Sequence, residues 1–408
     1  LTPVNCNLTS LGEHRTFTLY LQTGSSAPRC VEFSTAENIA MTFKKTVYMT
    51  MVIAVVLTVI IGAGCSGQKM GDGQNTTTTA GSTIQLQGSG ATFPKPIYEK
   101  WASEYGKVNP TVKIDYQGNG SGAGQKAILA KTSDFGASDD PMSDDDLKTA
   151  SGEILHIPTV LGAVVITYNL DGVKEPLKLS AQTISDIYLG NVKKWNDEKI
   201  KAENPDVTLP DADILPVYRA DASGTSAVFT DFLSKTVPEW KQKVGMNKQP
   251  SWITGVGVGA KGNDGVMGQV KQTPNSIGYV ELTFAKANNL PTAEIKNKAG
   301  KFVSASLDSV SAAAAGSVAA MPADLRTQIT NADGDGAYPI SSYTYILVYK
   351  DQTDAVKGKA LVDFLWWATH DGEKFGKELH YAPLPADVVK KVEGKIASIT
   401  NGGKPLRQ

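Results

Sequence analysis

The chain has 408 residues, enough for two domains of ordinary size, and its hydrophobic fraction of 41% and charged fraction of 20% are typical of a globular protein with a normal core. The formal net charge of −1 excludes the broad basic field that binds nucleic acid, so we expect no nucleic-acid partner. The three cysteines all lie within the first 65 residues and the four histidines have no ligand-like spacing, which argues against a zinc site, a Cys/His nucleophile or a disulfide framework in the rest of the chain.

The N-terminal region divides at Met41. Residues 1–40 show no clear hydrophobic period, and we expect them to be upstream sequence that the native protein lacks. Residues 41–65 contain two lysines, then an apolar run, then three small residues before Cys65, which is the pattern of a secretory signal that ends at a lipoprotein processing site. We therefore expect Cys65 to be lipidated, although Gly62 stands where such sites usually carry Leu. The alternative is that the apolar run remains as a membrane anchor.

Either alternative predicts a body at the cell surface or in the periplasm, anchored to the outer face of the cytoplasmic membrane. Residues 66–83 are small and polar without an apolar period, and we expect them to form a flexible linker between the membrane and the folded body.

The folded body begins with strand-like segments that run into glycine-rich turns. Residues 84–87 alternate as a strand should and lead through Gly90–Pro94 to a helical pattern, with Thr92 in the turn. The strand pattern of 112–116 leads in the same way through Gly118–Gly124, with Ser121 before the next helix. A third short strand ends at the carboxylate of Asp139. This alternation of strands and helices predicts an α/β fold.

A fourth turn is the most informative. Residues 217–219 are strand-like and end at Arg219, and a helix with an apolar stripe follows the turn 221–224. Ser223 is a good N-cap, Gly224 allows close approach of the backbone, and a helix start favours an anion. Arg219 adds a planar fork of donors that suits a tetrahedral oxyanion. The alternative is an ordinary capped helix beside an exposed arginine.

In open α/β sheets ligands bind beyond the carboxyl ends of the strands. The candidate residues at such ends are Thr92, Ser121, Asp139, Arg219, Ser223 and Thr225. Because the net charge is close to zero, an anion there has to be held by these local donors. For Asp139 the alternative role is an N-cap beside Pro141. The chain has no Gly-x-x-x-x-Gly-Lys-Ser/Thr sequence, and neither Ser121 nor Ser223 lies in a Gly-x-Ser-x-Gly elbow, so nucleotide hydrolysis and serine-hydrolase chemistry lack support.

Taken together, these segments resemble the phosphate-binding protein of bacterial and archaeal phosphate ABC importers. The resemblance covers residues 84–408 and rests on Gly90–Pro94, Gly118–Gly124, Asp134–Asp139, Ile187–Gly190, Arg219–Ser226, Lys261–Gly265 and Ile277–Glu281. It implies a two-lobed periplasmic-binding-protein fold of type II, with residues 84–162 and 343–408 in lobe I and residues 163–342 in lobe II. The two hinge crossings are expected near 162–167 and 338–343.

The resemblance also implies the binding residues and the partners. The residues expected to hold phosphate are Thr92, Phe93 through its backbone, Ser121, Asp139, Arg219, Ser223, Gly224 and Thr225. The loop after Gly120 departs from the family, which more often has two serines before paired glycines. The expected partners are inorganic phosphate, the membrane permease of the importer and the membrane through the lipid anchor, and the protein is expected to be a monomer. No catalytic residue, metal ion or cofactor is expected.

The chemistry of the candidate residues fits this expectation. Phosphate near neutral pH keeps at least one proton, whereas sulfate has none to give. An ionised Asp139 can only accept hydrogen bonds, so it favours the protonated anion and disfavours sulfate.

Two other functions remain open at this point. The first is a sensor or scavenger of another tetrahedral oxyanion, and the second is a secreted phosphatase with the same anion cradle. The second lacks an evident nucleophile–base pair or metal cluster, because histidines and cysteines are so few.

Overall fold

The structure is a computed structural model in which residues 17–19, 31–33, 83–173 and 175–407 are described. The chain divides into two units, Leu1–Thr79 and Ala80–Gln408. In the first, the short strands β1 (Phe17–Leu19) and β2 (Val31–Phe33) pair antiparallel. The expected signal segment 41–65 lies outside the described residues, as does the expected linker except for Thr83.

The first half of the larger unit is built on three parallel strands. The first strand group consists of β3 (Ile84–Gly90), β4 (Val112–Gly118) and β5 (Phe135–Ser138), in the order β4-β3-β5. Helix α2 (Lys95–Val108) packs against β4, and α3 (Ser121–Leu129) packs against β5. Because the first strand lies in the middle, the strand order reverses at β3, and the turns after β3, β4 and β5 all lie at the same edge.

The second half repeats this plan, although the sequence shows no internal repeat. The second strand group consists of β8 (Leu215–Arg219), β9 (Val258–Ala260) and β10 (Ser276–Glu281), in the order β10-β8-β9, all parallel. Helices α7 (Gly224–Thr236), α8 (Pro238–Lys243) and α9 (Gly262–Gln272) connect these strands, and α10 (Leu282–Ala287) follows β10. The first strand of this group again lies in the middle.

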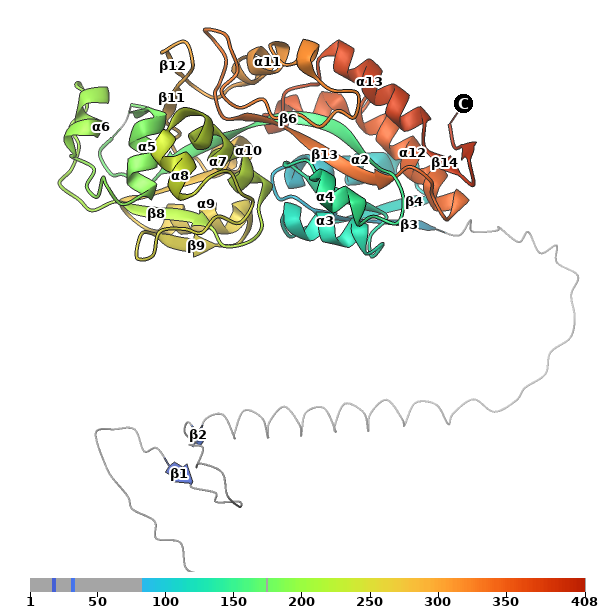
Figure 1. Cartoon of the computed structure of the whole chain (residues 1–408), viewed down its shortest axis with the longest axis horizontal. Coiled ribbons are helices and arrows are strands. Elements are labelled where there is room, and N and C mark those ends of the chain that lie inside the picture. The colour runs from blue at the N-terminus through green and yellow to red at the C-terminus, as the bar shows by residue number, and fades with distance from the viewer. Residues whose placement is uncertain (1–16, 20–30, 34–82, 174, 408) are drawn as a thin grey trace, which may run out of the picture. The chain divides into compact units, whose positions relative to one another are not determined.

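Two long strands join the groups into one eight-stranded sheet (Figure 1). Strand β6 (Ile154–Tyr168) pairs with β13 (Ser341–Tyr349) through Ala163 and with β10 from Val164 onward, so it changes partner at that point. Strand β13 also pairs with β5. All residues of β6 and β13 are buried, which explains their continuous apolar sequence.

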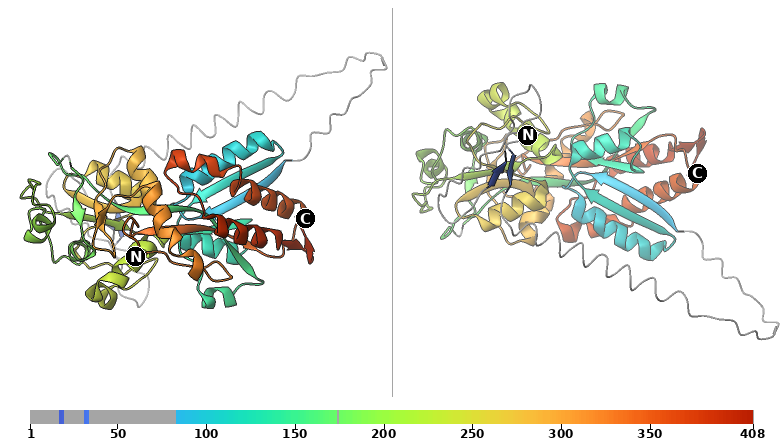
Figure 2. Two further views of the ribbon diagram at one scale, coloured as in Figure 1. Left: turned by 90° about the horizontal axis from the view of Figure 1, so that it is seen from above. Right: turned by 90° about the horizontal axis from the view of Figure 1, so that it is seen from below.

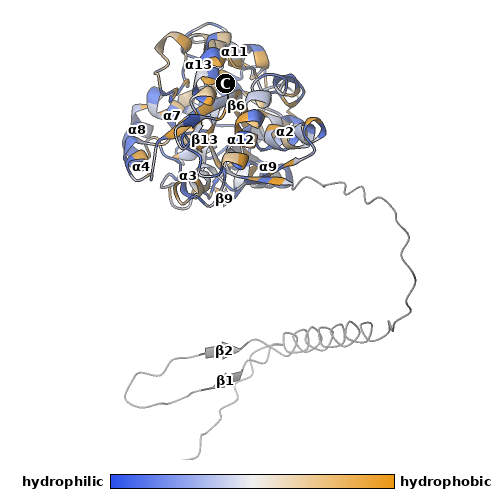
Figure 3. Ribbon diagram, turned by 90° about the vertical axis from the view of Figure 1, so that its right-hand side faces the viewer, coloured by the Kyte–Doolittle hydropathy of each residue, from blue (hydrophilic) through white to orange (hydrophobic). Residues whose placement is uncertain are grey.

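Helices cover both faces of the sheet, as the two views in Figure 2 show. Helix α2 begins just after Pro94 and buries the apolar face expected from the sequence, and in Figure 3 it carries hydrophobic and hydrophilic residues side by side. The α/β class predicted from the sequence is confirmed. The remaining elements are α4 (Asp144–Lys148), β7 (Lys178–Leu179), α5 (Ala181–Tyr188), α6 (Glu198–Glu203), β11 (Glu294–Lys296), β12 (Phe302–Val303), α11 (Leu307–Ala315), η1 (Val318–Ala320), α12 (Ala355–Ala368), η2 (Glu373–Phe375), η3 (Lys377–Leu379), α13 (Ala386–Ala397), β14 (Thr400–Asn401) and β15 (Lys404–Pro405).

Candidate anion-binding site

The first strand group places three of the predicted residues at its carboxyl edge. Thr92 follows β3, Ser121 begins α3 after β4, and Asp139 follows β5. All three side chains are buried, with 2% of Thr92, none of Ser121 and 1% of Asp139 exposed. Polar groups buried this completely are stable only with hydrogen-bond partners, so the partners of these three residues define the site.

The second strand group contributes the other predicted residues from β8 and the first turn of α7. Arg219 ends β8, and Ser223 caps α7 by accepting a hydrogen bond from the Ser226 N–H at 3.1 Å. Gly224 and Thr225 form the start of the helix and are fully buried. The positive end of the α7 dipole therefore points into the same region.

Direct hydrogen bonds join the two groups at this place. The Gly224 N–H donates to Ser121 Oγ at 3.0 Å, and the Gly122 N–H donates to the Ala222 carbonyl at 2.9 Å. A Cβ atom on Gly224 would lie 2.3 Å from Ser121 Oγ and 2.6 Å from Asp139 Oδ2. Only glycine fits here, because the two groups approach each other more closely than any side chain allows.

Arg219 is a buried cation, with 1% of its surface exposed. Its Nε and Nη2 donate to the two carboxylate oxygens of Asp221 at 2.8 and 2.6 Å, and its Nη1 donates to Thr225 Oγ1 at 3.3 Å. The alternative of an exposed arginine beside an ordinary helix start is therefore wrong. The bidentate contact fixes the guanidinium plane.

Asp139 is the most unusual group of the site. Its Oδ1 accepts a hydrogen bond from Thr344 Oγ1 at 2.8 Å, whereas its Oδ2 is buried without a partner among the described residues. The alternative role of Asp139 as a helix cap is excluded, because Ser143 caps α4. Burial raises the pKa of the Asp139 carboxyl to about 7, against the opposing effects of the Thr344 hydrogen bond and the Arg219 charge.

Two backbone N–H groups at the strand ends also lack a partner among the described residues. Within the described part of the chain, we find no acceptor for the N–H of Phe93 or for the N–H of Thr225, although both residues are fully buried. A buried carboxylate oxygen without a donor and buried N–H groups without acceptors are each costly, and an anion that carries a proton would satisfy both.

Three residues of the site were not predicted from the sequence. Asp221 orients Arg219, Thr344 donates to Asp139, and Asn263 donates its side-chain N–H to Thr92 Oγ1 at 3.0 Å and to Thr225 Oγ1 at 3.1 Å. Asn263 follows β9 at the start of α9, so the rule that pointed to the other strand ends applies to it as well. Thr344 lies inside β13 and gives no such signal.

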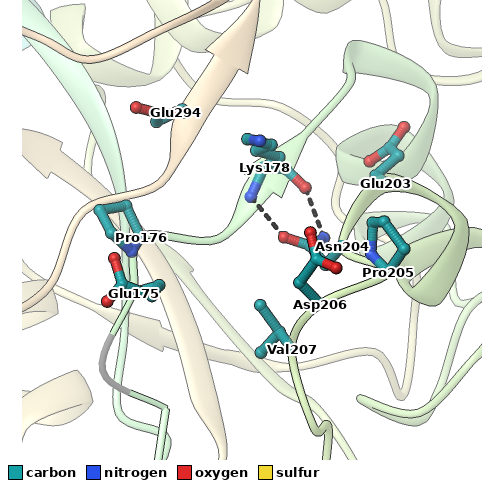
Figure 4. A pocket seen from close by; sticks show the side chains of 9 residues that line it. All are labelled: Glu175, Pro176, Lys178, Glu203, Asn204, Pro205, Asp206, Val207 and Glu294. Atoms are coloured by element: carbon teal, nitrogen blue, oxygen red, sulfur yellow. Dashed lines mark hydrogen bonds between the residues drawn. The ribbon is translucent and has the colours of Figure 1, made fainter.

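A surface pocket elsewhere in the body does not suit an anion. It has a volume of about 260 Å³ and lies where β7, α6 and β11 approach one another (Figure 4). Its charged lining residues are one lysine, Lys178, and four carboxylates: Glu175, Glu203, Asp206 and Glu294. Among the described residues no group of three or more His, Cys, Asp or Glu side chains is arranged to hold a metal ion.

Comparison with known proteins gives a consistent result. Residues 75–371 match the PBP superfamily domain. The chain is 43% identical over 334 residues to the phosphate-binding protein PstS of Pasteurella multocida, a match that covers 81% of this chain and 95% of that protein. It is 39% identical over 371 residues to the phosphate-binding protein PstS of Methanocaldococcus jannaschii, with 85% and 94% covered.

Two solved structures share the fold. A periplasmic phosphate-binding protein (PfluDING) bound with phosphate aligns with a TM-score of 0.61 at 22% identity, covering 76% of this chain and 93% of that one. A phosphate-binding protein from Stenotrophomonas maltophilia aligns with a TM-score of 0.62 at 20% identity, covering 79% and 96%. These likenesses confirm the predicted two-lobed α/β fold of type II.

Proposed function

This chain belongs to the PBP superfamily and, within it, to the phosphate-binding proteins, and we propose that it binds one inorganic phosphate ion at the site between the two strand groups and delivers it to the membrane permease of an ABC phosphate importer. The family resemblance expected from the sequence is thereby confirmed. The other two functions considered above, a receptor for a different oxyanion and a phosphatase, are not favoured by the relatives that match.

The observation that carries the proposal is the buried Oδ2 atom of Asp139. It has no partner among the described residues, and it lies beside Gly224 at the start of α7 and close to the Ser121 hydroxyl, which keeps a proton to donate. A lone acceptor among donors is complementary to an oxyanion that has one proton to give. Phosphate meets that requirement near neutral pH, and sulfate does not.

The predicted binding residues take complementary roles in this proposal. Asp139 accepts the proton of the anion, and Arg219 compensates its charge without needing to move, because Asp221 already holds the guanidinium in place. The proposed donors to the remaining oxygen atoms are the hydroxyls of Thr92, Ser121, Ser223 and Thr225 and the backbone N–H groups of Phe93 and Thr225. Gly224 contributes close approach of the backbone, because its N–H already donates to Ser121 Oγ. Ser223 can donate while it caps α7, because a hydroxyl that accepts a hydrogen bond keeps its own proton.

Release of the ion requires the groups to separate. We propose that lobe I comprises residues 84–162 and 343–408, that lobe II comprises residues 163–342, and that the hinge lies where β6 changes partner between Ala163 and Val164, together with the start of β13. In support, the contacts across the site are hydrogen bonds and ion pairs, which can re-form with water when the lobes move apart. We propose that the arrangement described here is the closed one.

We further propose that the body is held outside the cytoplasmic membrane by a lipid on Cys65 and by the linker 66–83, that residues 1–40 are upstream of the native protein, and that the protein acts as a monomer. The sequence pattern of residues 41–65 supports the lipid anchor and the assigned start of the native protein. In the described residues no helix is both long and apolar enough to cross a membrane. Intact-mass analysis of the protein from its native source tests these points, and peptides from residues 1–40 would contradict the assigned start.

The binding role is tested by isothermal titration of the ligand-stripped protein with phosphate and then with sulfate. We expect a single tight site for phosphate and little response to sulfate. Equal binding of both anions would indicate a general oxyanion receptor. We propose binding without enzymatic turnover, and release of phosphate from p-nitrophenyl phosphate by the purified protein would contradict that part.

A further inference from the structure

Asn263 occupies a central position that the proposed function does not explain. It is fully buried in the first turn of α9. Its Oδ1 accepts the Glu281 N–H at 3.1 Å. Since a backbone N–H can only donate, this contact fixes which end of the amide is the oxygen, and the Nδ2 group must face the site.

The Nδ2 group lies between two threonine hydroxyls from different strand groups. It donates to Thr92 Oγ1 at 3.0 Å and to Thr225 Oγ1 at 3.1 Å. The backbone N–H of Asn263 also donates to Thr92 Oγ1, at 3.1 Å. One residue thus supplies three hydrogen bonds to two side chains that are predicted to bind the anion.

Each of these hydroxyls accepts two hydrogen bonds. Thr92 Oγ1 accepts both from Asn263, and Thr225 Oγ1 accepts one from Asn263 and one from Arg219 Nη1. A hydroxyl has two acceptor lone pairs and one proton. With both lone pairs occupied, the only remaining hydrogen-bonding capacity of each hydroxyl is to donate its proton.

Both lone pairs of the Ser121 hydroxyl are also occupied, but by backbone donors. Its Oγ accepts from the backbone N–H groups of Asp139 at 3.2 Å and of Gly224 at 3.0 Å. Backbone donors cannot be removed by a side-chain substitution, but the Asn263 side-chain amide supplies one of the two donors to each of Thr92 and Thr225. Substitution of Asn263 therefore frees an acceptor lone pair on two hydroxyls at once.

We propose that Asn263 is a positioning residue that forces the hydroxyls of Thr92 and Thr225 to act only as donors toward the bound anion. This inference rests on the proposed phosphate-binding function. Its consequence is that Asp139 Oδ2 is the acceptor for a proton on the ion, whereas a hydroxyl with a free lone pair would offer a second place for a proton.

The test is a double-mutant cycle measured by isothermal titration with inorganic phosphate. Thr225 is chosen as the second residue of the cycle because it lies in the same strand group as Asn263. A substitution at either residue that only weakened lobe closure would then give additive losses of affinity, not a coupling energy between them. We expect Asn263→Ala to weaken phosphate binding about ten- to hundredfold, the scale of hydrogen bonds to a charged group. In the Thr225→Val background we expect the same change to cost at least threefold less.

The pH profile supplies a second readout that a purely structural role would not change. Without the Asn263 amide each threonine hydroxyl has a free lone pair and can accept a hydrogen bond from a protonated oxygen of the ion, so the loss of affinity in Asn263→Ala should be at least threefold smaller at pH 5.5 than at pH 8. The charged groups in and around the site are the same in both proteins, so their titration affects both alike. These groups are Lys95, Asp139, Asp140, Arg219, Asp221, Lys248, Asp264 and Glu281.

Gln269→Ala is the matched control, because Gln269 lies exposed on the same helix and bonds only to Thr273 among the described residues. Its affinity for phosphate should be that of the unsubstituted protein. If Asn263→Ala does not fold, Asn263→Asp in the same cycle replaces it, because its carboxylate still accepts from Glu281 but the side chain cannot donate to either threonine. Its charge repels the anion with or without the Thr225 hydroxyl, so the coupling again isolates the effect on that hydroxyl.

Additive penalties in the cycle, or a loss of affinity that does not depend on pH, would overturn the role of Asn263 while leaving phosphate binding intact. Failure of the unsubstituted protein to bind phosphate would instead reject the proposed function.

Discussion

Replacing Asp139 by asparagine should change how the stability of the ligand-free protein depends on pH. The buried carboxyl has a pKa of about 7, against an ordinary value of 3.8 in the unfolded chain. Because the folded state holds this proton more tightly, the stabilising contribution is complete below about pH 3.8 and is lost as the pH rises through about 7. A difference of about three pKa units corresponds to about 4 kcal/mol of unfolding free energy.

Asparagine cannot ionise, so Asp139→Asn should keep the stability that the unsubstituted protein loses as the pH rises. We expect the free energies of unfolding to be similar near pH 4, and the variant to be more stable by about 4 kcal/mol near pH 8. Urea unfolding of both phosphate-stripped proteins at pH 4, 5, 6, 7 and 8 measures this difference. Curves that stay parallel over this range would refute the argument that the carboxyl ionises in a dry environment.

The same variant should lose selectivity. An amide in place of the carboxylate removes an acceptor for the proton of phosphate and can present a donor to sulfate. The change should weaken the binding free energy of phosphate by about 1.5–3 kcal/mol, or about ten- to hundredfold in affinity. It should also reduce the ratio of the affinity for phosphate to the affinity for sulfate. An unchanged ratio of the two dissociation constants in a competition titration would show that Asp139 does not discriminate.

Three further substitutions test other parts of the site. Gly224→Ala should abolish phosphate binding in titrations, because the added Cβ would lie 2.3 Å from the serine hydroxyl that begins α3. The control is Gly106→Ala in α2, where the space around the glycine is open; this variant should bind phosphate normally and gain up to about 1 kcal/mol of stability. Arg219→Ala should destabilise the protein by about 3–5 kcal/mol in urea unfolding, because it leaves the Asp221 carboxylate largely buried without its partner. Adding Asp221→Asn should restore part of that stability but not phosphate binding, and recovery of binding would contradict the role of the guanidinium. Lys248→Met removes an ion pair to Asp140 and a hydrogen bond to Gln125, both of which join the two strand groups. The rate of phosphate release in stopped-flow measurements should rise about two- to fivefold, with little effect on the association rate. An unchanged release rate would show that this contact does not hold the two lobes together.

Much of the site was predictable because a local rule applies at each strand end. Thr92, Ser121 and Asp139 each follow a parallel strand, and Arg219 ends one, so each lies where ligands of an α/β sheet bind. The pairing of Arg219 with Asp221 was also accessible, since residues two apart in extended chain point to the same side. The chemistry of the anion followed from the same residues.

The rest of the site depends on contacts between distant parts of the sequence. Thr344 meets Asp139 across 205 positions, and Asn263 meets Thr92 across 171, and neither contact leaves a periodic pattern. Strand β9 has only three residues in a glycine-dense stretch, too short for its period to mark the turn that follows. The burial of Arg219 was also not predictable, because its neighbours include Trp252 and Tyr279, which lie 33 and 60 positions away in the sequence.

A crystal structure of the ligand-stripped protein grown with phosphate tests the central claim most directly. We predict one tetrahedral ion within hydrogen-bonding distance of Asp139 Oδ2 and of the N–H groups of Phe93 and Thr225. A phosphate ion bound at another place, with Asp139 Oδ2 still lacking a partner, would contradict it.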